Sequence, residues 1–415
     1  MKPRASLIGV SGFAGLHCQD LLQLAAEGKL SLTAATVVNP EDEPDKCRAL
    51  RNAGCEIFAD YREMLAAHRN RLDLCVVPTG IHHHAPMTLA ALDAGCNVLL
   101  EKPAAATVDE VEQMRVVSQD ANRFVAIGYQ HMYAPETQRL KSALLGGLIG
   151  RIRAIKCLGL WPRGTGYYSR NDWAGRLKAG RCWVLDAPFN NAFAHWLNLM
   201  LYFAGSKSFR GAKPVSLEAE LYRTRPIPST DTACLRIQTE EKIPILFWVS
   251  HSCLRDYGPV MEICGSMGTI VWTGKQILLR IPAGELPFAT CSEIHDNRRQ
   301  MLHAVLDRIA GHDSFVCGLE LAGLQTICAN AAFACTGIHP IGPEYLEFSP
   351  ADPGKAFAIR GMEEACRKAF FNEQLWSEMP LPWSQSAGTL EWDRFTSFQD
   401  VWKPASLEEP ALVAT

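Results

Sequence analysis

The feature of this sequence that most constrains its fold is a regular alternation of short apolar runs and amphipathic segments over roughly the first 125 residues. Residues 14–25 carry apolar side chains at helical spacing, and Thr107-x-x-Glu110 forms a capping box that opens a later helix. Buried strands are expected at residues 5–10, 32–38, 55–58, 72–77, 97–100 and 124–128. This alternation predicts a doubly wound, parallel α/β domain of the Rossmann type over residues 1–125.

The pattern changes after residue 130. Helices are expected near residues 135–145, 298–309 and 319–335. Strand-like runs separated by turn-rich loops occupy residues 152–160, 215–222, 232–238, 243–250, 260–264 and 269–272. They predict an α+β domain over residues 126–345, with an open and mostly antiparallel sheet. Residues 346–415 are richer in Pro and Trp, from Trp376 to Trp402, and are expected to form an ordered C-terminal extension.

Composition narrows the kind of partner. The chain has 415 residues, of which 48% are hydrophobic and 20% charged, as in a soluble globular protein. Its formal net charge of −3 and the lack of a basic run argue against nucleic acid or a membrane as partner. The N-terminus has no signal-peptide pattern, and the 15 cysteines include no C-x-x-C pair. We therefore expect a cytoplasmic protein.

Lys102 is the first candidate functional residue. The apolar run Val98–Leu100 continues into Glu101, Lys102 and Pro103, and the proline ends the strand. Lys102 is thus expected at the carboxyl edge of the parallel sheet, where open α/β folds bind ligands. A lysine there can orient an oxygen atom or lose its proton when partly buried. An ordinary surface lysine at a strand end is the alternative.

The turn after the first strand is the candidate phosphate-binding loop. Read as G-x-G-x-x-G, it offers Gly9, Ser11 and Ala14, with Gly12 and Phe13 in the same turn. Small residues let the backbone approach a pyrophosphate, and the following helix N-terminus supplies N–H donors. The alternative is a plain tight turn between strand and helix.

Asn39 bears on the choice of cofactor. It ends the second strand, where NAD enzymes usually present an acidic residue to the ribose hydroxyls. An asparagine can hydrogen-bond a 2′-hydroxyl, and no Arg or Lys lies beside it to hold a 2′-phosphate. The sequence therefore favours NAD over NADP.

Three segments together resemble a known family. Glu101-Lys102-Pro103 is preceded by His84-Ala-Pro-Met-Thr-Leu-Ala-Ala-Leu-Asp-Ala-Gly95 and followed by Gly128-Tyr129-Gln130. This order resembles the glucose–fructose oxidoreductase/inositol dehydrogenase (Gfo/Idh/MocA) family over roughly residues 5–340. The resemblance implies a nicotinamide cofactor, a sugar or cyclitol substrate, and a second domain whose open sheet often forms oligomer contacts, so we expect a homodimer or homotetramer. The cofactor contacts that it implies are Thr79, His82, Glu101, Lys102 and Gln130.

The resemblance also points to a catalytic helix. In the family this helix commonly reads D-x-x-x-H-x-x-D, and this chain has Asn191, His195 and Asn198 at those positions. Read as one helix, the three residues share a face. The resemblance implies that His195 handles the hydroxyl proton while Lys102 hydrogen-bonds the same oxygen. The missing carboxylate at Asn191 makes a strong general base less secure, and a hydrogen-bonded core histidine is the alternative.

An aromatic-rich loop between residues 161 and 196 is the candidate substrate-binding segment. Tyr168, Arg170 and Trp173 are the expected contacts, together with Lys102, Asn191 and His195, because sugar rings present C–H faces rimmed by hydroxyls. Loop packing or an oligomer contact is the alternative. No metal is expected, since the consecutive His82, His83 and His84 cannot converge on one ion.

The leading hypothesis is an NAD-dependent oxidoreductase that moves a hydride between nicotinamide and a sugar or cyclitol carbon. Two alternatives stay open. One is a glycosidase or lyase that works by transient sugar oxidation and elimination. The other is a non-catalytic NAD-binding regulator, which is favoured by Asn191 and Asn198 at the positions of the two motif aspartates.

Overall fold

The computed structural model describes residues 2–348, 357–392 and 397–398, and the chain divides into two compact units. Both units are discontinuous in sequence. The first comprises Met1–Ala105, Asp109–Ala134 and Ile294–Gly323, and the second comprises Ala106–Val108, Pro135–Glu293 and Leu324–Thr415.

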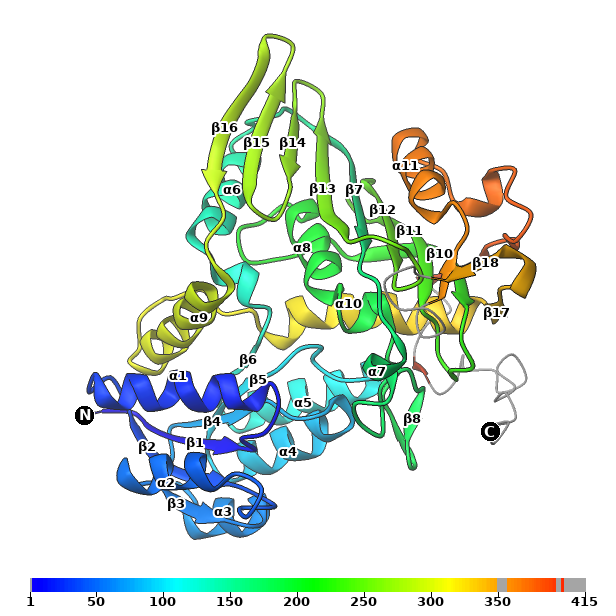
Figure 1. Cartoon of the computed structure of the whole chain (residues 1–415). Helices are drawn as coiled ribbons and strands as arrows, with labels where there is room; N and C mark the ends of the chain where they lie inside the picture. Colours follow the sequence, from blue (N-terminus) through cyan, green and yellow to red (C-terminus); the bar gives the residue numbers. More distant parts are fainter. Residues whose placement is uncertain (1, 349–356, 393–396, 399–415) are drawn as a thin grey trace. The chain divides into compact units, whose positions relative to one another are not determined.

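The first unit is built on a six-stranded sheet (Figure 1) with the order β3-β2-β1-β4-β5-β6 and parallel pairing throughout. The strands are β1 (Arg4–Ile8), β2 (Ser31–Thr36), β3 (Glu56–Phe58), β4 (Leu74–Val77), β5 (Asn97–Leu100) and β6 (Val125–Ile127). They coincide with the predicted apolar runs because strands covered on both faces are apolar along their whole length. The strand order reverses between β1 and β4, which places a ligand-binding crevice at the carboxyl ends of these strands.

Helices connect these strands: α1 (Ala14–Ala26), α2 (Pro44–Asn52), α3 (Tyr61–Ala67), α4 (Ile81–Asp93), α5 (Val108–Asp120) and the 3-10 helix η1 (Gln130–Tyr133). Helix α4 contains His82, His83 and His84 in its first turns. These histidines interrupt the apolar periodicity, although His84 is fully buried.

A late segment of the chain completes the first unit. Helix α9 (Ile294–Ile309) carries Arg298, whose Nε lies 2.9 Å from Oδ2 of Asp20 on α1. Both side chains are buried, so this ion pair joins segments 278 residues apart in sequence. Pairing of this kind leaves no local sequence signal.

The second unit is built on a ten-stranded sheet with the order β16-β15-β14-β13-β7-β12-β11-β10-β17, where β20 also pairs with β10. All pairs are antiparallel except β7–β12 and β10–β17, so the predicted mostly antiparallel sheet is confirmed. The strands are β7 (Ile152–Leu160), β10 (Pro214–Arg223), β11 (Thr232–Thr239), β12 (Pro244–Ser250), β13 (Tyr257–Gly265), β14 (Thr269–Trp272), β15 (Gln276–Ile281), β16 (Gly284–Thr290), β17 (Ile338–Pro340) and β20 (Gly388–Glu391). The sequence missed β15 and β16, since β16 is largely exposed and contains a proline.

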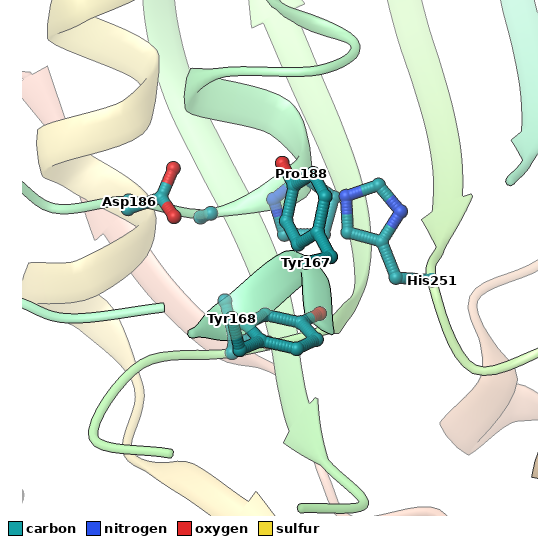
Figure 2. Close-up of a pocket in the computed structure, with 7 residues that line it drawn as sticks. Tyr167, Tyr168, Asp186, Pro188 and His251 are labelled. Atoms are coloured by element: carbon teal, nitrogen blue, oxygen red, sulfur yellow. The ribbon is translucent and has the colours of Figure 1, made fainter. Parts of the chain in front are cut away.

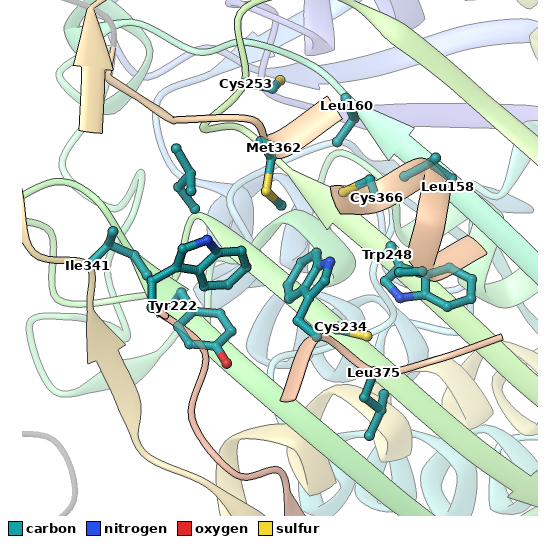
Figure 3. Packing of buried hydrophobic residues seen from close by; sticks show 14 of the residues in the cluster. Leu158, Leu160, Tyr222, Cys234, Trp248, Cys253, Ile341, Met362, Cys366 and Leu375 are labelled. Carbon is teal, nitrogen blue, oxygen red and sulfur yellow. The ribbon is translucent and has the colours of Figure 1, made fainter. Parts of the chain in front are cut away.

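Side chains cover both faces of this sheet. On β7, Leu158 and Leu160 join an apolar cluster with helix α11 (Met362–Asn372), drawn in Figure 3. Between them, Gly159 lies against the ring of Phe193, the N-cap of helix α8 (Ala194–Ala204). Because neighbouring strand residues point to opposite faces, α8 and α11 cover opposite faces of the sheet.

The C-terminal segment contributes to this core. Trp376 is fully buried in the cluster, and Trp383 packs beside it. Trp402 lies outside the described residues. The remaining elements are α6 (Pro135–Leu145), α7 (Thr165–Tyr168), β8 (Lys178–Ala179), β9 (Cys182–Trp183), η2 (Pro188–Asn190), α10 (Leu319–Cys335), η3 (Pro343–Tyr345), β18 (Leu346–Phe348), β19 (Phe357–Ile359) and η4 (Trp376–Glu378). In the described part of the chain, no helix has the length and apolar character needed to cross a bilayer.

Candidate active site

The turn between β1 and α1 has the conformation expected of a phosphate-binding loop. Gly9 and Gly12 adopt φ of +90° and +57°, which favours glycine at both positions. Helix α1 starts at Ala14; its N-cap residue Phe13 provides no side-chain cap, and its first turn has no acidic residue. Ser11, Gly12 and Phe13 are exposed and Ala14 is buried. The positive end of the helix dipole is thus open to an anion, which fits the pyrophosphate of NAD.

A lysine that the sequence analysis missed supports this turn. Lys46 Nζ on α2 donates to Val10 O at 2.9 Å and forms an ion pair with Glu43 at 2.7 Å. Hydrogen bonds from Lys46 and from Ser11 lower the pKa of the Glu43 carboxyl. Asn39, the expected ribose contact, is exposed just before this segment. Lys46 lies outside the motif, so only the three-dimensional structure reveals it.

Glu101 holds the backbone of Lys102. Its buried carboxylate lies 2.9 Å from His17 Nε2 and accepts a 3.0 Å hydrogen bond from the Lys102 N–H. Burial raises the Glu101 pKa, but the hydrogen bond and charge of His17 and the charge of Lys102 outweigh it and lower the pKa overall. A Cβ at Gly128 would lie 2.7 Å from Glu101 Oε1, so only glycine fits there. The Glu-Lys-Pro and Gly128 signals are thus parts of one packed unit.

His84 links the ends of β4 and β5. Its Nδ1 lies 2.8 Å from Pro103 O and its Nε2 lies 3.1 Å from Thr79 O. Burial lowers the His84 pKa to about 4, because its effect is larger than that of the two carbonyl hydrogen bonds, which raise the pKa. Since Val77 on β4 pairs with Leu100 on β5, Thr79 and Lys102 both follow at the carboxyl edge of the sheet.

Two further predicted cofactor contacts lie in the first unit. The ring of His82 packs at 3.9 Å from that of His83 in the first turn of α4. Gln130 is buried in η1, and its Oε1 has no hydrogen-bond partner among the described residues. A buried amide oxygen without a donor fits a ligand such as a carboxamide. No group of three or more His, Cys, Asp or Glu side chains in the described segments could hold a metal ion.

The structure corrects the placement of Asn191. Helix α8 begins at Ala194, and Asn191 precedes it with φ −131° and ψ −81°, after the turn η2. Asn191 therefore does not share a helical face with His195 and Asn198. Only the latter two lie on α8, where His195 is partly exposed and Asn198 is fully buried.

Asp186 is the functional candidate that the sequence analysis missed. Its carboxylate is 3% exposed and accepts hydrogen bonds from Asn191 Nδ2 at 2.8 Å and from the Gly175 N–H at 2.6 Å. A carboxylate therefore lies one hydrogen bond from Asn191. The available signal was that Asp186 is the only acidic residue between Asp172 and Glu218.

The expected substrate-binding segment forms a small pocket in the second unit. Figure 2 shows Tyr167 and Tyr168 of α7 beside Asp186, Pro188 and His251. The Arg170 guanidinium lies 3.6 Å from the Tyr167 ring centroid and 5.7 Å from that of Trp173. Of the three expected substrate contacts, only Tyr168 lines this pocket, whereas Arg170 contacts the rings of Tyr167 and Trp173. The pocket adds His251, which no motif marks.

A parallel sheet with a glycine turn after its first strand and a strand-order reversal beside it defines a dinucleotide-binding fold. The family model described as "Oxidoreductase family, NAD-binding Rossmann fold" matches residues 4–129. The model of the GFO/IDH/MocA C-terminal domain matches residues 137–271. The chain therefore belongs to the Gfo/Idh/MocA oxidoreductase family, and NAD is the cofactor of its Rossmann domain.

Two curated relatives each match part of this chain. Inositol 2-dehydrogenase 4 of Saccharopolyspora erythraea is 34% identical over 164 residues, which are 38% of this chain and 46% of the relative. D-glucoside 3-dehydrogenase of Escherichia coli is 24% identical over 175 residues, which are 41% of this chain and 46% of the relative. The chain thus spans about half the length of these relatives.

Solved structures share the fold over a longer stretch. The WlbA dehydrogenase of Bordetella pertussis, in complex with NADH and UDP-GlcNAcA, is 20% identical with a TM-score of 0.64, covering 80% of this chain and 97% of that one. An inositol dehydrogenase homologue of Azotobacter vinelandii, complexed with NADH and myo-inositol, is 15% identical with a TM-score of 0.65, covering 80% and 96%. At these identities the likeness shows the fold.

Proposed function

We propose that this protein is an NAD-dependent dehydrogenase that oxidises a hydroxyl-bearing carbon of a sugar or cyclitol. The observation that carries the proposal is the fixed position of Lys102 at the carboxyl edge of the sheet. Glu101 binds its backbone N–H, and His84 binds the carbonyl of Pro103, the residue that follows it. Relatives named as inositol and glucoside dehydrogenases support this substrate class.

The residues that would hold NAD lie in the first unit. The N–H groups of Ser11, Gly12 and Phe13, in the turn that ends at Ala14, would bind the pyrophosphate, and Asn39 would bind the adenosine ribose. Thr79, His82 and Gln130 would contact the nicotinamide ribose and carboxamide. NAD, when bound, accepts a hydride from the substrate carbon.

The chain's own residues would handle the proton. His195 accepts the proton of the substrate hydroxyl, and the Lys102 ammonium donates a hydrogen bond that stabilises the oxygen as its charge develops. Asp186 fixes the Asn191 side-chain amide ahead of the helix that carries His195. We propose that this buried carboxylate takes the place of the aspartate that the family motif has at position 191.

The test is NADH formation across a panel of sugars and cyclitols, with the Lys102→Ala and Lys29→Ala variants. Lys102→Ala should lose turnover by at least about 100-fold, as expected for a group that stabilises a transition-state charge, and should retain NAD binding. Lys29 is an exposed lysine of the same unit, and its replacement should change neither property. Full turnover in Lys102→Ala would refute the proposed role.

The same assay separates the alternative functions. Retained NAD and cleavage of a glycoside without net NADH would favour oxidation followed by elimination. NAD binding without hydride exchange on any substrate would favour a regulator. A cytoplasmic homo-oligomer remains a prediction. Its subunits would contact each other through the ten-stranded sheet, outside strands β7 and β12, because α11 covers those two strands.

A further inference from the structure

We infer that the arginine-bearing surface around Tyr167, beside the small pocket, binds an anionic group, so that the substrate is a sugar carrying a carboxylate or a phosphate. The inference rests on the proposed function, whose substrate class it narrows. It starts from two arginines on the loop that follows β7. The guanidinium groups of Arg163 and Arg170 lie 5.1 Å and 3.6 Å from the Tyr167 ring centroid.

Neither arginine has a carboxylate partner within the described part of the chain. Arg170 Nη1 donates to the backbone carbonyl of Tyr167, and Arg163 Nη1 lies 3.5 Å from the carbonyl of Pro162. The buried Nε of Arg163 has no hydrogen-bond partner among the described residues. Arg163 is half-buried and Arg170 is exposed. A buried donor such as Arg163 Nε normally has an acceptor, and a carboxylate or phosphate fits the forked guanidinium geometry best.

The charges near the pocket do not balance. The buried Arg225, 5.3 Å from the Tyr168 ring centroid, forms an ion pair with the buried Asp231 at 3.3 Å. Asp186 lines the pocket, but its two oxygens accept hydrogen bonds from Asn191 and Gly175. Arg163 and Arg170 thus have no ion-pair partner among the described residues, and Arg170 presents its charge to solvent, where an anionic group can reach it.

The remaining groups suit a sugar ring. Tyr168 Oη is buried and has no partner among the described residues, so a hydroxyl can bind there. His251 Nδ1 lies 2.9 Å from Trp161 O, and burial lowers the His251 pKa to about 3. The neutral ring therefore donates from Nδ1 and leaves Nε2 as an acceptor for a second hydroxyl.

The experiment compares neutral and anionic sugars on the whole protein loaded with NAD. Glucose, glucuronate and glucose 6-phosphate are assayed for NADH formation and, by calorimetry, for binding. The variants are Arg163→Gln and Arg170→Gln. Arg176→Gln is the control, because Arg176 is an exposed arginine of the same loop.

The expected result is a kcat/KM that is about 10- to 100-fold higher for an anionic sugar than for glucose, the range of one or two charge-assisted hydrogen bonds. This preference should disappear in both test variants, mainly through KM, and persist in Arg176→Gln. Glucuronate and glucose 6-phosphate distinguish a carboxylate from a phosphate.

Two failures are distinguishable. NADH formation from neutral sugars with no anionic preference, or a preference that survives both substitutions, overturns the anion site and leaves the dehydrogenase function standing. Anion binding that needs Arg163 and Arg170 without NADH formation from any sugar supports the site and overturns the dehydrogenase function.

Discussion

Replacing Asp186 by Asn is the most informative single change in the second unit. The Asp186 carboxylate accepts two hydrogen bonds while almost fully buried. An asparagine keeps one acceptor oxygen and turns its NH2 group toward the other donor, either Gly175 N–H or the Asn191 amide. One charge-assisted hydrogen bond is lost and two donors then face each other, which costs about 2–4 kcal/mol.

Calorimetric melting and steady-state kinetics together test this reasoning. For a unit of this size the loss corresponds to a fall of about 5–15 °C in the melting temperature of its transition. If Asp186 positions Asn191 for the reaction, kcat should also fall while KM changes little. Asp172→Asn, at an exposed position of the same loop, is the control and should match the wild type.

The outcomes separate a structural role from a positioning role. A lower melting temperature with unchanged kcat would leave Asp186 a purely structural residue. If Asp186→Asn melted at the temperature of Asp172→Asn, the hydrogen bonds assigned to its carboxylate would be refuted.

Two further predictions concern buried ionisable groups. Glu101→Gln should lower the free energy of unfolding by about 1.5–3 kcal/mol at pH 7. Since the folded-state pKa of Glu101 is lowered, its contribution is present above the unfolded value near 4.5 and is lost as pH falls through the folded pKa. Urea unfolding at pH 7 and pH 4 checks this, and an equal loss at both pH values would contradict it. Burial lowers the pKa of Lys141, which caps α8 at Tyr202 O and Gly205 O, to about 8 from 10.5. Between these values the unfolded chain binds more protons, so wild-type stability relative to Lys141→Met should rise by about 3 kcal/mol from pH 8 to pH 10.5; a flat difference would refute the shift.

The first unit was predictable from sequence because its chemistry is local. Each parallel strand is a short apolar run, and Gly9, Gly12 and Lys102 lie directly after strands β1 and β5. Adjacent parallel strands end at the same edge, so position along the chain already places these residues at the ligand-binding side. The predictions of the family, of the fold class and of NAD are confirmed.

The second unit was less predictable because its packing is non-local. The cluster that buries Trp376 draws on β7, β10, β11, β12 and the C-terminal segment, so no window of sequence contains it. The late segment of the first unit is equally non-local, since Arg298 pairs with Asp20 across 278 residues. Side chains paired at such distances in sequence look like ordinary surface charges until the fold brings them together.

Asn191 shows where sequence reasoning and structure differ most usefully. Helical spacing put Asn191 and His195 on one face, but η2 ends at Asn190 and α8 starts only at Ala194. Because Asn191 lies outside the helix, its side-chain amide donates a hydrogen bond to Asp186, five residues earlier in the chain. A motif read position by position records a lost carboxylate, whereas the structure has a buried carboxylate one hydrogen bond away. If the Asp186 carboxylate takes the place of the motif aspartate, as proposed above, then the asparagine at position 191 does not by itself indicate a non-catalytic protein.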